Sequence, residues 1–578
     1  MFTIITLSFS SLLVSDITIQ QAAPDTTIAF VSATNIGDIL SKLETAGACD
    51  KICAAVCSEF NVDYASNAGS AFESLCDAMG ISSEDFTSPS GYAGAALYPV
   101  IDFESGTVGL GGIAMIELEE KLYGELVNEM TEMSNSEPSF DSEIVSLVGR
   151  DVMMIQYEMP EVDMPVMNLD LEAFERSYVV YTDGFLIVGT EPDGIASALL
   201  ALDGEVEPDM LETNEDYITL RDRCGGEGDV FAGILLTNLA DTVMQMDDSS
   251  MAMMIMPSVK TLFGDFDGIA QTTMLSPSED VFIDATYTVL MNDGRNGLMS
   301  IVGENTTQSP KPVFIGEDTL MYSQGVLDLN KLVPVLRDTI MGQPMLSMQM
   351  GPQMDMFEAG LTSFLAPLGR KYHIVSTGSM PFVMETVGTL LAIECNDEEA
   401  FSGTLSATLP AMGTTPTDFL GNQIYTIDLG AGIPIPMEME MEYSIAVGGG
   451  YVFMGTQRNV ENALRAIANP KDTLATDTTD LSLMLGSDDV SNLGYGDMGK
   501  SLAVQRAMQA ATTEDMFKEM ESFDPQMAEE MRNSFAEADD LNATIFEIFV
   551  AILGPTAWDL KTDEHGMTSR VIVMQSAK

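Results

Sequence analysis

The chain has 578 residues, 46% of them hydrophobic and 20% charged, which is a globular composition too long for one ordinary core. Its 89 acidic and 24 basic residues give a formal net charge of −65, spread along the whole sequence, so it repels phosphate backbones and no nucleic-acid partner is expected. A dispersed acidic excess is typical of a solvated surface in salty surroundings, and cation binding is the alternative.

The first segment along the chain is an apolar run from Phe2 to Val14 that ends at Asp16. The run is shorter than the roughly 20 residues that span a bilayer, and it suits the apolar part of a secretory signal. We therefore expect residues 1–23 to be a signal peptide and the protein to be exported, to the periplasm, the cell surface or the extracellular space. No basic residue precedes the run, so a buried first strand is the alternative. No later segment reads as a membrane helix, so no integral membrane segment is expected after signal removal.

Four of the six cysteines lie near the start of the chain. Cys49, Cys53 and Cys57 recur every four residues on one face of an expected helix, and Cys76 lies on the next apolar segment. In an exported protein we expect a disulfide between Cys57 and Cys76. Buried reduced cysteines are one alternative and zinc is another, although the spacing differs from paired CxxC knuckles and no histidine is near. The remaining two cysteines should stay reduced.

The sequence repeats itself, and this repeat sets the expected architecture. Residues 177–202 match residues 442–467, and both segments read as strand, tight turn, strand and amphipathic helix. Three further pairs of segments match in the same order. Those of the first copy begin at Pro24, Thr107 and Ser278, and those of the second begin at Glu317, Thr386 and Glu564.

Hairpins within the repeat require antiparallel pairing, and helices alternate with the strands. We therefore expect an α+β fold of two tandem related copies, each with a mainly antiparallel sheet and packed helices. The copies are expected at residues 24–302 and 313–578. Residues 303–312 have the polar residues and prolines of a linker.

Two short elements resemble a family of uncharacterised exported bacterial proteins that carry a repeated strand-turn-strand-helix element. The matching residues are PDT at 24–26 and the hairpin DGFLIVGT at 183–190. The second copy departs from this pattern, with GGY at 449–451. The resemblance implies export and no particular activity.

The sequence carries no recognised catalytic motif. Its two histidines, His373 and His565, lie in a strand-like segment and a terminal turn, so both are expected to be structural or surface residues. Serine and cysteine hydrolases usually need a histidine base, and no GxSxG, HExxH or GxxxxGK[ST] pattern occurs. The run GLGGIA at 109–114 fits the dinucleotide fingerprint, but the residues after it continue as a strand. We expect a glycine-rich strand there and no cofactor.

Methionine is unusually frequent, with 43 residues. Thioethers are soft ligands for Cu(I), and the weak candidates for such a site are Met341, Met345, Met348 and Met350. The alternative is that methionine replaces leucine as an adaptable core filler. We favour this alternative because two of the four positions align with cysteines of the first copy, on a face that stays apolar.

Together these observations favour a non-catalytic, exported binding or scaffold protein. One alternative is a carrier of a hydrophobic ligand or Cu(I), held between the copies or under the Pro-Met segments that precede the matching hairpins, at 159–167 and 433–441. Another is a hydrolase that uses only carboxylates, which would place a few acids with raised pKa values in a deep cleft.

Overall fold

The computed structural model of the chain divides into two compact units. The first contains residues 1–257, 266–279 and 283–294, and the second contains residues 258–265, 280–282 and 295–578. The structure describes residues 18–45, 91–101, 108–117, 140–157, 176–206, 208–245, 257–278, 280–307, 312–316, 318–342, 347–348, 350–378, 387–412, 414–428, 442–470, 489–523, 532 and 552–576.

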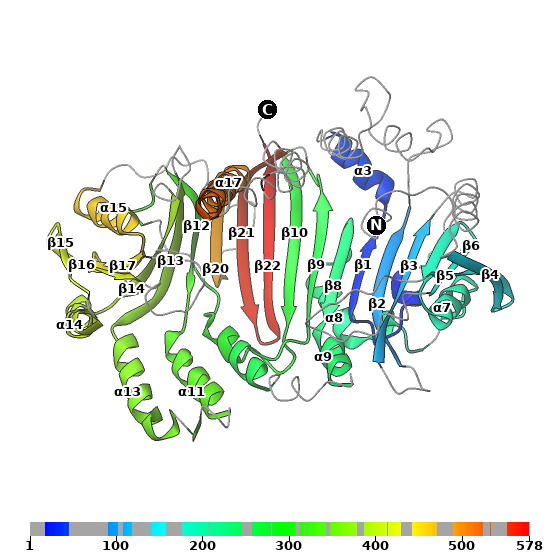
Figure 1. The fold of residues 1–578 in the computed structure, drawn as a ribbon, viewed down its shortest axis with the longest axis horizontal. Coiled ribbons are helices and arrows are strands. Elements are labelled where there is room, and N and C mark those ends of the chain that lie inside the picture. The colour runs from blue at the N-terminus through cyan, green and yellow to red at the C-terminus, as the bar shows by residue number, and fades with distance from the viewer. Residues whose placement is uncertain are drawn as a thin grey trace. The chain divides into compact units, whose positions relative to one another are not determined.

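Antiparallel strands build the sheet of the first unit (Figure 1). In spatial order they run β4, β5, β6, β7, β3, β2, β1, β8, β9 and β10. Their bounds are β1 Ala29–Ala33, β2 Ala93–Ile101, β3 Val108–Glu117, β4 Phe140–Leu147, β5 Arg150–Tyr157, β6 Arg176–Thr182, β7 Phe185–Gly189, β8 Val230–Leu235, β9 Gly268–Leu275 and β10 Val281–Leu290. Burial alternates along β1, as expected for a strand with one face on the core.

The helices of the first unit pack on both faces of its sheet. They are α2 Ile19–Ala22, α3 Ile36–Thr45, α7 Pro192–Leu202, α8 Glu215–Arg223 and α9 Leu236–Gln245, with the 3-10 turn η3 Leu211–Thr213. Helices α2, α7 and α8 contribute to the main core, in which Phe30 and Tyr217 meet edge to face at 5.1 Å. Helix α3 contributes Ile36 to a smaller cluster with Ala93 and Ile116.

The sheet of the second unit follows the order β15, β16, β17, β18, β14, β13, β12, β20, β21 and β22. The bounds are β12 Thr319–Val326, β13 Leu368–Gly378, β14 Val387–Cys395, β15 Thr417–Phe419, β16 Asn422–Asp428, β17 Glu442–Gly448, β18 Tyr451–Gly455, β20 Asn492–Asp497, β21 Leu553–Asp563 and β22 Gly566–Gln575. A separate short pair joins β11 Thr306–Thr307 to β19 Asp489–Val490.

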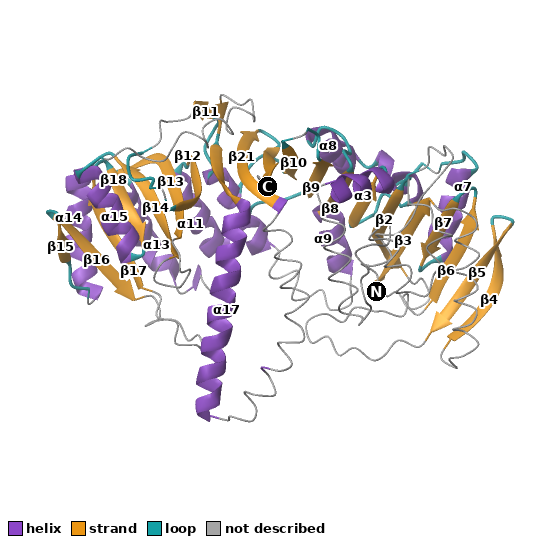
Figure 2. Cartoon of the chain, turned by 90° about the horizontal axis from the view of Figure 1, so that it is seen from above, coloured by secondary structure: helices purple, strands orange, loops and turns teal. Residues whose placement is uncertain are grey.

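Helices of the second unit are α11 Leu332–Gly342, α13 Met354–Leu365, α14 Glu398–Thr408, α15 Gln457–Ala468 and α17 Met498–Phe523, with 3-10 turns η4 Gly297–Ile301, η5 Leu329–Lys331, η6 Gly351–Gln353 and η7 Leu409–Met412. Helix α15 packs on β17 and β18 and contributes Val460, Ala463 and Leu464 to the core. Helix α17 starts against the sheet of its unit and continues beyond it (Figure 2). Among the described helices, none has both the length and the apolar character that crossing a bilayer requires.

The two units have the same strand order. Gly189 of β7 lies opposite Ile113 of β3, whereas Gly455 of β18 lies opposite Leu390 of β14, two residues from the position that the match of Thr107 with Thr386 gives. A Cβ at Gly455 would clash with the backbone oxygen of Thr389, so this position requires glycine. A Cβ at Gly189 would meet the backbone oxygen of Gly112 at 3.4 Å, an ordinary van der Waals distance.

Two hairpin turns also agree between the units. In each turn both central residues have positive φ, the conformation of the two-residue turns that match strand twist. The turn at Val148 and Gly149 corresponds to the one at Leu420 and Gly421. The turn at Asp183 and Gly184 corresponds to the one at Gly449 and Gly450.

Helices and antiparallel strands confirm the α+β class, and the run GLGGIA lies in strand β3, as predicted. The division between the units differs from the predicted one, because residues 295–302 belong to the second unit. Part of the predicted linker at 303–312 is also held by that unit. Gly303 N–H donates to the Val326 carbonyl at 2.7 Å, and the Asn305 side chain exchanges two hydrogen bonds with the backbone of Thr562. These residues were predicted to form a linker, but they are hydrogen-bonded to strands β12 and β21.

The predicted signal peptide falls into two parts. Residues 1–17 lie outside the described residues. Residues 19–22 form α2, and this helix packs in the core of the first unit. A cut after Ala23 would therefore remove a core element.

Candidate functional site

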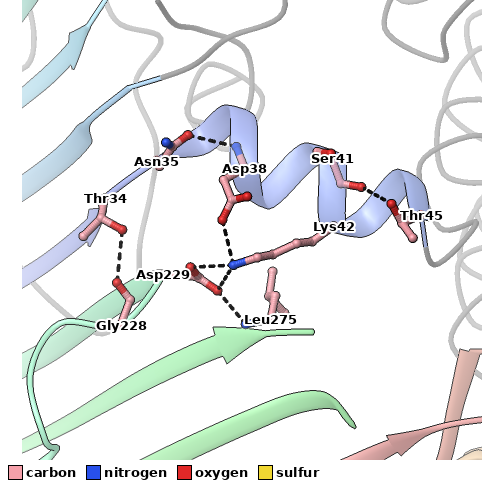
Figure 3. A network of polar contacts seen from close by, with 9 residues as sticks. All are labelled: Thr34, Asn35, Asp38, Ser41, Lys42, Thr45, Gly228, Asp229 and Leu275. Atoms are coloured by element: carbon pink, nitrogen blue, oxygen red, sulfur yellow. Dashed lines mark hydrogen bonds and ion pairs between the residues drawn. The ribbon is translucent and has the colours of Figure 1, made fainter. Parts of the chain in front are cut away.

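Lys42 ties helix α3 to the strands of the first unit (Figure 3). Its Nζ lies 2.9 Å from both carboxylate oxygens of Asp229, just before β8, and 2.8 Å from a carboxylate oxygen of Asp38. Asp229 also accepts a hydrogen bond of 2.6 Å from the backbone N–H of Leu275, at the end of β9. One partly buried ionic cluster therefore joins three elements.

The charge state of Lys42 favours a structural role over a catalytic one. Burial alone would lower the pKa of Lys42, but hydrogen bonds to Asp38 and Asp229, together with their charges, outweigh it and raise the pKa. A catalytic lysine needs a lowered pKa, which frees the amine to act as a base or nucleophile. Lys42 is therefore protonated at neutral pH and holds two carboxylates.

Replacing Lys42 with Met is expected to loosen α3, because the change leaves Asp38 and Asp229 facing each other without a cation. We expect a loss of about 1 kcal/mol in the free energy of unfolding and faster amide hydrogen exchange in residues 36–45. Lys42→Arg keeps the charge and should lose less. Equal losses in the two variants would mean that packing of the side chain, and not its charge, holds α3.

A buried histidine lies in an aromatic cluster of the second unit. His373 is 2% exposed, and its Nδ1 lies 2.9 Å from the hydroxyl of Tyr322. The rings of Phe314 and Tyr451 approach it at 5.9 and 5.6 Å. Burial, with a smaller contribution from the charge of Lys371, lowers the pKa of His373 to about 4. The imidazole is thus neutral at pH 7 and packs within the core, in the structural role that the sequence predicts.

Among the described residues of the first unit, two carboxyl groups have a raised pKa. Burial and the charge of Asp193 raise the pKa of Glu191, which immediately precedes helix α7. Burial and the charge of Asp209 raise the pKa of Asp25. A carboxylate-only hydrolase places two carboxyl groups about one substrate bond. Burial is the larger cause of each pKa shift and a different acidic neighbour the smaller one, so the two shifts do not indicate a shared pair of carboxyl groups.

Strand β4 forms one edge of the sheet in the first unit (Figures 1 and 2). Its inward side chains Val145 and Leu147 pack against the core, which holds the strand in place. Ile144 points the other way and is 66% exposed. Among the described strands, only β5 pairs with β4, so the outer edge of β4 faces away from the sheet.

The corresponding edge of the second unit is much shorter. Strand β15 pairs only three residues with β16, and Pro416 immediately precedes it. Short edge strands and proline are common devices that prevent edge pairing. Strand β4 has eight residues and no proline. The fold therefore accommodates a blunted edge at this place, and the first unit has a long one instead.

The cysteines and methionines singled out in the sequence are only partly described. Cys57 and Cys76, the expected disulfide pair, lie outside the described residues, as do Cys49 and Cys53. The other two cysteines, Cys224 and Cys395, are buried and unbridged.

Three of the four candidate copper ligands are described. Met341 lies near the C-terminus of α11 and is 48% exposed, whereas Met348 is 76% exposed. Met350 is half-buried, and Met345 lies outside the described residues. In the described part of the chain, no group of three or more His, Cys, Asp or Glu side chains could hold a metal ion.

Sequence reasoning missed both Lys42 and Ile144 as residues of interest. Lys42 has one local signal, Asp38 four residues earlier on the same helical face, but its partner Asp229 is distant in the chain. The alternating residues 142–147 could have indicated a strand. No local pattern could have shown that this strand lies at an edge.

Searches of protein-family models, curated proteins and solved structures found no match for this chain.

Proposed function

We propose that the chain is a non-catalytic, exported binding protein made of two related copies, and that it binds an extended partner segment along strand β4. The common strand order and turn conformations of the two units support the duplication. The units differ at this edge, because β4 has eight residues and β15 has three. This difference supports a role for the first unit that the second does not share.

The observation that carries the binding role is the exposed edge of β4. A strand edge presents a row of backbone N–H and C=O groups to which an extended segment can add as a further strand. Residues 143–147 of this strand alone are enough for such hydrogen bonds. The exposed side chain of Ile144 would then supply a contact to an apolar side chain of the partner.

Charge indicates which partner fits this edge. The hairpin of β4 and β5 contains Asp141, Glu143 and Asp151, and its one basic residue, Arg150, is already paired with Asp183 and Asp203. A basic extended peptide therefore complements the edge. A second copy of this chain fits poorly, because two chains of charge −65 repel each other.

A labelled eight-residue peptide that alternates lysine and valine tests this proposal by fluorescence anisotropy in about 0.15 M salt, where general attraction to the acidic surface is screened. We expect Ile144→Lys to weaken its binding about tenfold, because the change removes the apolar pair and adds a like charge. Met348→Lys adds the same charge at an exposed methionine of the second unit and should leave binding unchanged.

A peptide that alternates lysine and proline provides the matched control. It has the same charge, but its proline residues lack the backbone N–H groups needed for strand addition. We expect it to bind far more weakly. Equal binding of both peptides, or equal effects of both substitutions, would reduce the interaction to general electrostatics and refute the edge site. Self-association that Ile144→Lys abolishes would instead identify a second copy as the partner.

A further inference from the structure

The segment just before Pro24 is part of the folded core. Ile19, Ala22 and Ala23 are fully buried, and Gln20 is nearly so. Helix α2 packs against α7, the turn η3 and strand β2. Such burial is typical of a core element and not of a leader that is removed before folding.

Polar contacts fix this segment at several points. The N–H of Ile19 donates to the Tyr92 hydroxyl at 2.6 Å, and that hydroxyl donates to Gln20 Oε1 at 3.3 Å. The N–H of Leu211 donates to the carbonyl of Ala23 at 2.8 Å. Without this segment, the buried hydroxyl of Tyr92 would lose both partners, which is costly in a core.

Strand β2 is adapted to the same segment. A Cβ at Gly94 would lie 2.7 Å from the Cβ of Ile19 and 2.5 Å from the Tyr92 hydroxyl. Position 94 is therefore restricted by both side chains, and Ile19 packs directly against the backbone of β2.

The described part of the chain begins at Thr18. The backbone of Thr18 accepts a hydrogen bond from the N–H of Gln21 and its own N–H donates to the Gln21 side chain at 3.2 Å, which caps α2. The apolar run ends at Val14, and Ser15 is the small residue between this run and α2.

We propose that export removes the leader by a cut between Val14 and Thr18, so that residues 19–23 remain in the mature protein as its first core element. The reaction is peptide hydrolysis by a signal peptidase. Water supplies the hydroxyl that becomes part of the leader's new carboxylate, and the mature chain leaves with a new amino group. This inference rests on the proposed export.

The N-terminus of the exported protein tests the position of the cut. The full chain, produced in a secreting bacterial host, is purified from outside the cytoplasm and its terminal peptide is identified by mass spectrometry. We expect the mature protein to begin between residues 15 and 18. A protein that begins at Pro24 or later would overturn the proposed cut and leave export standing. A chain recovered only from the cytoplasm and still beginning at Met1 would overturn export and the cut together, and an uncut chain outside the cytoplasm would overturn the cut alone.

Substitutions in the full chain test whether the segment belongs to the core. Ile19→Ala should lower the melting temperature of the first unit by roughly 5 °C or more, because it leaves a cavity in a fully buried site. Ile19→Val removes one methylene and should cost much less. A chain that begins at Asp16 should melt like the mature protein, whereas one that begins at Pro24 should melt well below it or fail to fold. Equal stability of these two shortened chains would overturn the inference.

Discussion

Phe453→Ala is expected to destabilise the second unit by about 3–5 kcal/mol, the usual cost of deleting a large aromatic side chain from a core. Phe453 is fully buried at the centre of β18. Its ring meets Phe314 nearly perpendicularly at 5.3 Å and Tyr451 at 5.9 Å. Truncation would leave a cavity among rigid rings that cannot collapse to fill it.

The single tryptophan of the chain provides the measurement. Trp558 lies on β21 of the second unit, so its fluorescence during urea unfolding reports that unit. Met454→Ala is the matched control, because the next residue of the strand points to the opposite face and is partly exposed. A loss no larger for Phe453→Ala than for Met454→Ala would contradict the placement of this core.

Stability of the second unit should also fall as the pH decreases from about 6.5 to about 4, because of His373. Burial lowers its pKa to about 4 in the folded state, whereas the unfolded chain takes up the proton near the ordinary value of 6.5. Between these values the unfolded state binds more protons, so acid favours unfolding. The full shift corresponds to about 3 kcal/mol, most of it lost by pH 4 and the rest below it.

Comparison with His373→Phe isolates this effect from the many carboxylates that titrate in the same range. The variant loses the hydrogen bond to Tyr322 at every pH, but it has no proton to gain. The difference in unfolding free energy between the native chain and the variant should therefore move in favour of the variant as the pH falls through this window. A difference that stays constant from pH 7 to 4 would show that His373 is not buried in its neutral form.

Local signals in the sequence predicted local structure well. The segments 177–202 and 442–467 form strand, turn, strand and helix as expected, in β6, β7 and α7 and in β17, β18 and α15. A glycine-containing turn between alternating strands fixes such a hairpin without help from the rest of the chain. The same locality explains why GLGGIA could be recognised as a strand.

Contacts between distant segments could not be predicted in this way. Strand β1 pairs with β8, about 200 residues later, and no local pattern specifies that neighbour. The tie between Lys42 and Asp229 depends on this pairing. The apolar run at the start of the chain is compatible with a leader or a core element, and only the structure shows that Ile19 belongs to the core.

The central claim is that β4 receives an extended basic segment, and hydrogen exchange along the hairpin tests it most directly. The lysine-valine peptide is added to the full chain, and amide exchange is followed by mass spectrometry with and without it. Exchange should slow in residues 140–147 and stay unchanged in the blunted edge at 417–419, because only the first edge can pair along its length. Equal protection of both edges, or no protection of residues 140–147 while the peptide is bound, would contradict the account.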